Sequence, residues 1–81
     1  MSEEPLEFLQ NNINNKVWIV SRNEVEYSGV LKGFDDSLNV VLSDMTVYGP
    51  DNSKTTHTKA LIRRDQIDLI IPNLEDGRLQ K

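Results

Sequence analysis

The apolar positions near the start of the chain recur at helical spacing. Leu6, Leu9 and Ile13 follow one another every three or four residues, which is typical of one buried helix face. Pro5 stands just before them and suits the first position of a helix. The asparagines between residues 11 and 15 are poor helix formers. The pattern therefore predicts a short helix that begins at Pro5 and ends among these asparagines.

From Lys16 onward the apolar period changes to two, which predicts strands. The first of them, KVWIVS, is rich in the β-branched and aromatic residues that suit a pleated surface. Gly29 and Gly33 predict sharp bends or bulges within the second strand. The segment GPDNSKTTHT, residues 49–58, is polar throughout and predicts a loop. The strands are expected at residues 16–21, 25–34, 38–48, 59–63 and 66–71.

A helix followed by five strands on short turns predicts a mostly β fold class. Antiparallel strands that bend at glycines curl into a small barrel, here strongly bent and five-stranded behind an N-terminal α-helix. We expect a single domain over residues 1–81, with a core at about 5–72 and a frayed polar tail at 73–81. So few strands close the barrel only partly, which leaves unpaired backbone groups on its edges. Pairing with a neighbouring subunit would cover them.

Length and composition strengthen the case for partner subunits. An 81-residue chain is marginal as an independent fold and usually needs disulfides, a metal or a partner. The chain has no cysteine, and its single histidine, His57, cannot build a zinc site unaided. We therefore expect no metal and no cofactor, and partner subunits remain as the source of additional stability.

The charge balance excludes some partners and leaves others open. Nine Lys and Arg against 13 Asp and Glu give a net charge of −4, which rules out a broad basic surface for non-specific nucleic-acid binding but allows a local site. No apolar run approaches the roughly 20 residues that span a bilayer, so no membrane is expected. The acidic start of the chain does not match a signal peptide, and we expect the nucleus or the cytoplasm.

Two segments resemble the signatures of a known family. Residues 29–42, GVLKGFDDSLNVVL, are similar to the first signature of the Sm and like-Sm (LSm) proteins, and residues 60–67, ALIRRDQI, are similar to the second. The resemblance covers residues 5–72 and includes the helix before the strands. It implies the Sm fold and a ring, commonly of seven subunits, in which the fourth strand of one subunit pairs with the fifth strand of the next.

The resemblance also implies a function. Family rings bind uridine-rich RNA in their lumen. Eukaryotic like-Sm rings bind the 3′ end of U6 snRNA in pre-mRNA splicing, or oligoadenylated mRNA in mRNA decay, and archaeal rings are usually homomeric. Residues 14–17 and 33–36 resemble the fifth-numbered eukaryotic subunit, residues 3–6 resemble the third, and an archaeal homomeric member stays possible. The partners implied are other Sm-like subunits and uridine-rich RNA.

The family resemblance assigns roles to four residues of a candidate RNA pocket. Asn39 carries both a donor and an acceptor, so its amide is suited to pair with a uracil edge. Asp35 is suited to hold that amide in orientation. Position 37, here Ser37, is where the base stacks, and Arg63 is suited to cap the base with its guanidinium plane. One such pocket in each subunit of a ring needs no basic surface.

Two residues depart from the family pattern. Ser37 stands where relatives often carry an aromatic residue or His, so the stack is expected to be weak or missing. Arg64 stands where relatives usually carry Gly. The pair Arg64–Asp65 is unusual for a tight turn, because such turns favour residues that accept a positive φ. We expect either a reshaped turn or an added phosphate contact from Arg64. The candidate RNA-binding residues are therefore six: Asp35, Ser37, Asn39, Arg63, Arg64 and Asp65.

Other readings of the same residues compete with RNA binding. Asp35–Asp36 is a turn-forming pair rather than a catalytic dyad, His57 sits among polar residues, and no phosphate loop or nucleophile motif is present, so we expect no enzyme. A ring subunit with a silent pocket would serve as a scaffold. A monomeric small-barrel adaptor is the third possibility, and a monomeric mass in solution would favour it.

Overall fold

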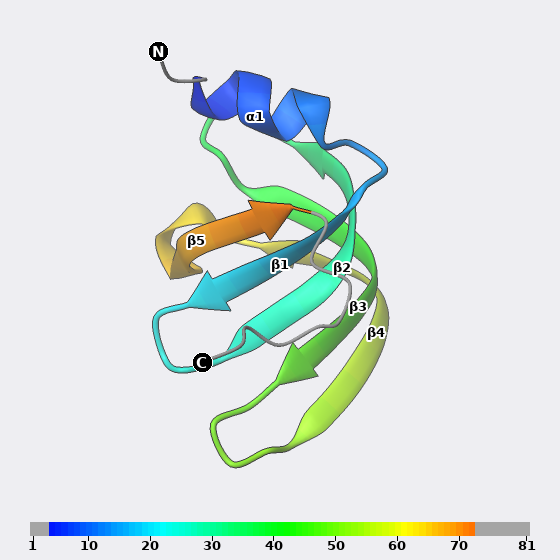
Figure 1. Ribbon diagram of the computed structural model, residues 1–81, viewed down its shortest axis with the longest axis vertical. Coiled ribbons are helices and arrows are strands. Elements are labelled where there is room, and N and C mark those ends of the chain that lie inside the picture. Colours follow the sequence, from blue (N-terminus) through cyan, green and yellow to red (C-terminus); the bar gives the residue numbers. More distant parts are fainter. Residues whose placement is uncertain (1–3, 73–81) are drawn as a thin grey trace.

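The computed structural model describes residues 4–72, which form a short helix and five strands (Figure 1). A 3₁₀ turn, η1, lies between the last two strands. The order of helix and antiparallel strands confirms the predicted fold class. The elements are α1 (Pro5–Asn11), β1 (Lys16–Ser21), β2 (Glu26–Phe34), β3 (Val40–Tyr48), β4 (Lys54–Ile62), η1 (Arg64–Gln66) and β5 (Ile67–Pro72).

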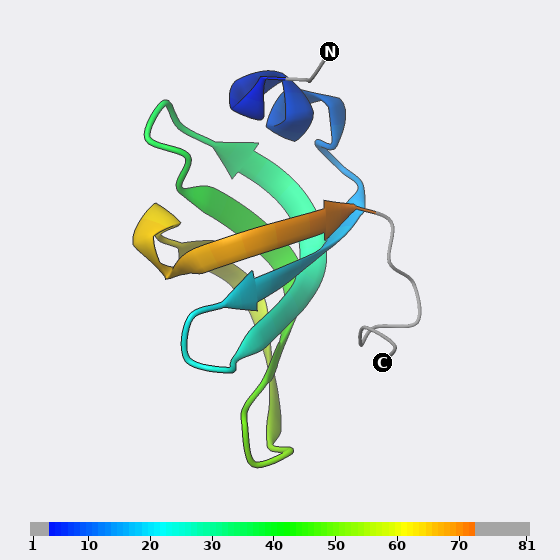
Figure 2. The same ribbon diagram turned by 60° about the vertical axis from the view of Figure 1, so that its left-hand side comes forward.

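The five strands form one antiparallel sheet with the order β4-β3-β2-β1-β5. Figures 1 and 2 show the sheet curving strongly, with α1 lying across one end of it. Among the described residues, β4 pairs only with β3 and β5 pairs only with β1. The sheet therefore ends in two edge strands that do not pair with each other.

The predicted bends occur at the two glycines of β2. The pairing of β2 with β3 changes register between Ser28 and Val30 and again between Leu31 and Gly33. A Cβ atom on Gly29 would lie 2.9 Å from the backbone oxygen of Ser43. Only glycine permits this close approach of the two strands, so the residue type at position 29 determines how the sheet bends.

The core lies on the inner side of the bent sheet and is covered at one end by α1. Leu9 is the buried residue of the helix, and Asn12 ends the helix where the asparagines begin, as expected. Ile13 lies beyond the helix and packs against the core only in part. The buried hydrophobic residues of the main cluster are Leu9, Val17, Ile19, Leu31, Val40, Leu42, Met45 and Ile62.

Trp18 on β1 is fully buried and lies outside this main cluster. Its indole Nε1 donates a hydrogen bond of 2.7 Å to Oε1 of Glu26, and its ring stacks on Tyr48 with centroids 5.0 Å apart. A buried indole with a satisfied N–H is typical of a structural aromatic residue. Trp18 therefore has a structural role in the packing of the sheet.

The predicted loop over residues 49–58 is wrong in its second half. β4 begins at Lys54, so only residues 49–53 connect it to β3, and His57 lies within the strand opposite Met45. The segment KTTHT is exposed on both faces because it forms one edge of the sheet. An exposed edge strand needs no apolar alternation, and threonine favours strands through its β-branched side chain.

Other boundaries differ from the prediction by one or two residues. β3 begins at Val40 rather than at Leu38, because Leu38 has a φ of 69°, which is incompatible with extended backbone. β5 begins at Ile67, after η1. Within residues 4–72, no helix has the length and apolar character that crossing a membrane would require.

Candidate functional site

Two segments far apart in the sequence meet on one side of the sheet. The turn 35–39 joins β2 to β3, and the segment 63–65 joins β4 to β5. Together they line a shallow polar depression of about 330 Å³, which we call the polar pocket. Its lining residues are Ser37, Asn39, Arg63, Arg64 and Asp65. Five of the six predicted site residues therefore share one pocket, and the sixth, Asp35, is hydrogen-bonded to two of them.

The carboxylate of Asp35 organises the turn. Its Oδ1 accepts hydrogen bonds from the backbone N–H groups of Ser37 and Asn39, both at 3.0 Å. Its Oδ2 accepts one from Nδ2 of the Asn39 side chain, also at 3.0 Å. These donors favour the ionised carboxylate, and the Asn39 side chain, followed by the Asn39 backbone N–H, holds the pKa of Asp35 below its ordinary value.

The side-chain amide of Asn39 is held from both ends. Nδ2 donates to Asp35, and Oδ1 accepts a 2.8 Å hydrogen bond from the backbone N–H of Arg64. A carboxylate only accepts and a backbone N–H only donates, so these partners fix which end of the amide is oxygen. The bond to Arg64 also joins the two signature segments, residues 29–42 and 60–67. Its two residues lie 25 positions apart in the sequence.

This arrangement leaves the Asn39 amide with unused hydrogen-bonding capacity. An amide has two N–H donors and two acceptor lone pairs, and its contacts with Asp35 and Arg64 use one of each. One donor and one acceptor remain on a half-buried residue that lines the polar pocket. The site therefore presents a pre-oriented donor–acceptor pair, which is suited to the edge of a planar base.

Charged side chains surround that amide. Arg63 and Arg64 are both exposed, and within residues 4–72 neither takes part in an ion pair. A guanidinium that is not tied to a carboxylate is available for a base face or a phosphate. Ser37 is exposed too, but its short hydroxyl offers no ring on which a base could stack.

The segment Arg64–Asp65 forms a 3₁₀ turn rather than a tight turn with a positive φ, so the turn is reshaped, which is one of the two expected alternatives. These residues open the 3₁₀ turn η1, in which the N–H of Gln66 donates to the carbonyl of Arg63 at 3.0 Å. Neither residue has a positive φ, so no glycine is required. The left-handed residue of the site is Leu38 instead, between Ser37 and Asn39. Sequence patterns alone placed Leu38 in a strand, and nothing in its residue type indicates a positive φ.

His57 lies away from the polar pocket. It lines a separate shallow depression on β3 and β4, together with Asp44, Met45 and two threonines. Among the residues that the structure describes, no group of three or more His, Cys, Asp or Glu side chains could hold a metal ion.

The model of the LSM domain family matches residues 7–72. The LSM complex subunit lsm5 of Schizosaccharomyces pombe is 35% identical over 69 residues, which cover 84% of this chain and 86% of the yeast protein.

Solved structures agree with the sequence comparisons. The Sm protein of Pyrococcus abyssii, solved in complex with a uridine heptamer, has a TM-score of 0.81 and 30% identity over 88% of this chain and all of that one. A heptameric archaeal Sm protein has a TM-score of 0.71 and 26% identity over 80% of this chain and 94% of that one.

The fold and the matched residues define the class of the protein. The chain belongs to the LSM domain family, the Sm-like proteins, as the two signatures indicated. Members of this family are RNA-binding subunits without enzymatic activity, which confirms the expectation that this chain is not an enzyme. Within the family, the chain is similar to a eukaryotic LSm5 subunit and to archaeal Sm proteins.

Proposed function

We propose that this chain is a subunit of a ring of Sm-like proteins and binds uridine-rich RNA through the polar pocket. The observation that carries the proposal is the Asn39 amide, fixed between Asp35 and the backbone of Arg64 with one donor and one acceptor free. Uracil presents an N–H donor beside a carbonyl acceptor on its pairing edge. A bidentate contact between the two satisfies both groups on each side.

Three charged side chains, those of Arg63, Arg64 and Asp65, complete the proposed pocket, and each has a different role. The exposed guanidinium of Arg63 caps the face of the base, and Arg64 contacts a phosphate from the same side. Asp65 faces the same depression and disfavours a phosphate close to itself by charge repulsion. The base therefore sits near Asn39 and Arg63, with the RNA backbone toward Arg64.

Related proteins support both parts of the proposal. The Pyrococcus abyssii protein was solved with a uridine heptamer, the other archaeal protein is heptameric, and the fission-yeast protein is a subunit of an LSM complex. By similarity to that subunit, we propose that the ring acts on U6 snRNA in splicing, on mRNA ends in decay, or on both, in the nucleus or the cytoplasm. Its partners are then other Sm-like subunits.

Alanine variants of the pocket test the proposal directly. Asn39→Ala and Arg63→Ala should weaken oligouridine binding by about 1–3 kcal/mol per pocket, roughly five- to 150-fold in Kd. Lys32→Ala is the matched control, because it removes an exposed positive charge that lies outside the pocket. Fluorescence anisotropy with labelled oligouridine measures the affinities, and native mass spectrometry checks that the assembly is unchanged. Equal binding by all four proteins would reject the proposed pocket.

A scaffold role is the second candidate, and Ser37 favours it. The pocket lacks a ring at this position, and stacking contributes about 1–3 kcal/mol per base in single-strand binding. If RNA binding is weak for this reason, Ser37→Tyr should tighten oligouridine binding markedly. A silent pocket would instead leave the affinity unchanged in Ser37→Tyr as well as in Asn39→Ala.

A further inference from the structure

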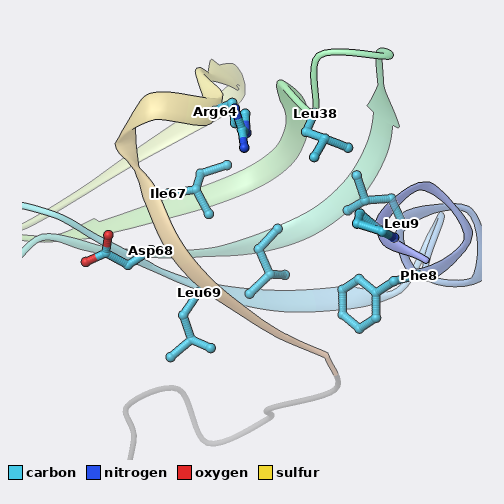
Figure 3. A pocket seen from close by; sticks show the side chains of 9 residues that line it. Phe8, Leu9, Leu38, Arg64, Ile67, Asp68 and Leu69 are labelled. Carbon is cyan, nitrogen blue, oxygen red and sulfur yellow. The ribbon is translucent and has the colours of Figure 1, made fainter. Parts of the chain in front are cut away.

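Leu38 stands between two residues of the polar pocket but belongs to a different surface. Ser37 and Asn39 line the polar pocket, whereas Leu38 lines a second, apolar pocket (Figure 3). That apolar pocket has a volume of about 380 Å³ and lies between α1, the turn 35–39 and β5. The charged residues Arg64 and Asp68 also line it, and its apolar lining includes Phe8, Leu9, Leu38, Ile67 and Leu69.

The backbone of Leu38 is in a conformation that leucine rarely adopts. Its φ is 69°, in the left-handed region where a Cβ atom crowds the following carbonyl group. Glycine or asparagine would occupy this position at lower conformational cost. The leucine side chain must therefore contribute packing that offsets this cost.

That packing is visible around the apolar pocket. Leu38 is half-buried and packs against the main core cluster, and Figure 3 shows its side chain pointing toward the same space as Ile67 and Leu9. Its backbone N–H donates to the carbonyl of Asp35 at 2.9 Å, which closes the turn. The Leu38 side chain thus ties the middle of the turn that carries Asp35 and Asn39 to the hydrophobic core.

We propose that Leu38 is a positioning residue of the polar pocket. By anchoring in the apolar pocket beside Ile67, it holds the left-handed turn so that Asn39 meets the backbone of Arg64. Arg64 lines both pockets, and Ile67 follows it at the start of β5, so the residues that meet Asn39 and Leu38 lie on one short stretch of chain. This inference rests on the proposed RNA-binding function, but it also makes a claim about the turn that does not involve RNA.

Three substitutions at position 38 separate positioning from simple packing. Leu38→Gly suits the backbone and removes the anchor, Leu38→Ala removes the anchor and keeps a Cβ atom, and Leu38→Met restores an apolar side chain of similar size. Binding of oligouridine should weaken about tenfold in the Gly and Ala variants, by analogy with the loss of groups that orient metal ligands. The Met variant should bind like the parent. All affinities are measured well below the melting temperature of each variant.

A second measurement, the carboxyl pKa of Asp35, reports on the conformation of the turn without RNA. The carboxyl pKa of Asp35, followed by NMR, should rise toward its ordinary value in the Gly and Ala variants, because the Asn39 donors are then held less firmly. It should stay depressed in Leu38→Met. A residue that only fills the core would lower the melting temperature and leave both this pKa and the affinity unchanged, and that result would overturn the proposal.

The Asn39→Ala background separates this inference from the proposed function. If Leu38 acts through Asn39, Leu38→Gly should cause little further loss of affinity in that background. Fully additive losses would overturn the positioning role. If Asn39→Ala alone has no effect on binding while the Asp35 pKa still rises in Leu38→Gly, the positioning role holds and the RNA-binding function fails.

Discussion

At the scale of single residues, the turn 35–39 depends on one carboxylate. Asp35 accepts three hydrogen bonds from two residues, and two of these donors are backbone N–H groups. A carboxylate that bonds to the N–H two residues ahead of it forms an Asx turn. The same carboxylate then orients the amide of Asn39, so turn formation and base recognition share one group.

The sequence predicted part of this arrangement. The resemblance to the Sm-like signature implied that Asp35 orients the amide of Asn39, and the hydrogen bonds agree with that role. The other partner of the amide could not be predicted, because it is a backbone N–H of Arg64 from a distant segment. A backbone group carries no signature in residue type, so only the fold reveals it.

The ionisation of Asp35 predicts how the stability of the fold and the affinity for RNA depend on pH. Its pKa is lowered in the folded protein, first by the side chain and then by the backbone N–H of Asn39. A depressed folded pKa stabilises the native state at pH values above the unfolded pKa, ordinarily 3.8, and this contribution is lost as the pH falls through the folded pKa. Oligouridine affinity should therefore not change between neutral pH and about pH 5 through this group.

Asn39→Ala should raise the Asp35 pKa toward 3.8, as measured by the NMR titration of its carboxyl carbon. Asp51 is a matched control, because its pKa is lowered by Ser53, in the turn between β3 and β4. The substitution should leave the Asp51 titration unchanged. An unchanged Asp35 pKa in Asn39→Ala would contradict the hydrogen-bonding account of the turn.

At the scale of elements, β3 and β4 form a long hairpin whose outer strand is polar. The apolar period predicted β1, β2 and β3 well, because their inner faces are buried in the core. It missed residues 54–58 because an edge strand exposed on both faces has no such period. Strand pairing there depends on the ladder with β3, which a single-sequence pattern does not contain.

Two deletions in this hairpin should differ sharply in their effect. Removing residues 50–52 leaves Gly49 and Ser53 between the paired residues Tyr48 and Lys54. A two-residue loop with glycine first suits a type II′ hairpin turn, so the fold should persist with a melting temperature within about 5 °C of the parent.

Removing residues 51–56 takes away the first three residues of β4. The residues that they pair with on β3 would then enter the loop, including Val47 and Tyr48, which stacks on Trp18. The loss of this packing should cost about 2–3 kcal/mol, which lowers the melting temperature of a domain this size by about 10 °C or more. Thermal unfolding followed by circular dichroism compares the two deletions, and equal stability would mean that β4 begins after residue 56.

At the scale of the whole molecule, the sheet ends in two strands that lack a second neighbour within residues 4–72. An exposed leucine lies on each: Leu61 on β4 is 62% exposed, and Leu69 on β5 is 47% exposed. Unpaired strand edges with apolar side chains favour pairing with another chain. The small size of the domain adds to this tendency, because its own core is limited.

We therefore expect the pure chain to form rings or stable partial rings at micromolar concentration, as measured by native mass spectrometry. Leu61→Lys and Leu69→Lys should each shift the mass toward smaller species, since each places a charge on an edge that would be buried by pairing. Leu6→Lys is the matched control, because Leu6 is 39% exposed but lies on α1 rather than on an edge strand. Its assembly should equal that of the parent.

The same measurement distinguishes the remaining forms of assembly. A closed ring of the pure chain would identify a homomeric protein, whereas partial rings that close only with subunits captured from the source would identify a heteromeric one. A folded monomer at micromolar concentration, unchanged by Leu61→Lys and Leu69→Lys, would contradict the ring and favour a monomeric adaptor. If β4 of one subunit pairs with β5 of the next, the two leucines lie on the two halves of one contact, and both variants should reduce assembly to a similar degree. An effect of only one of them would mean that its edge strand alone contributes to the contact.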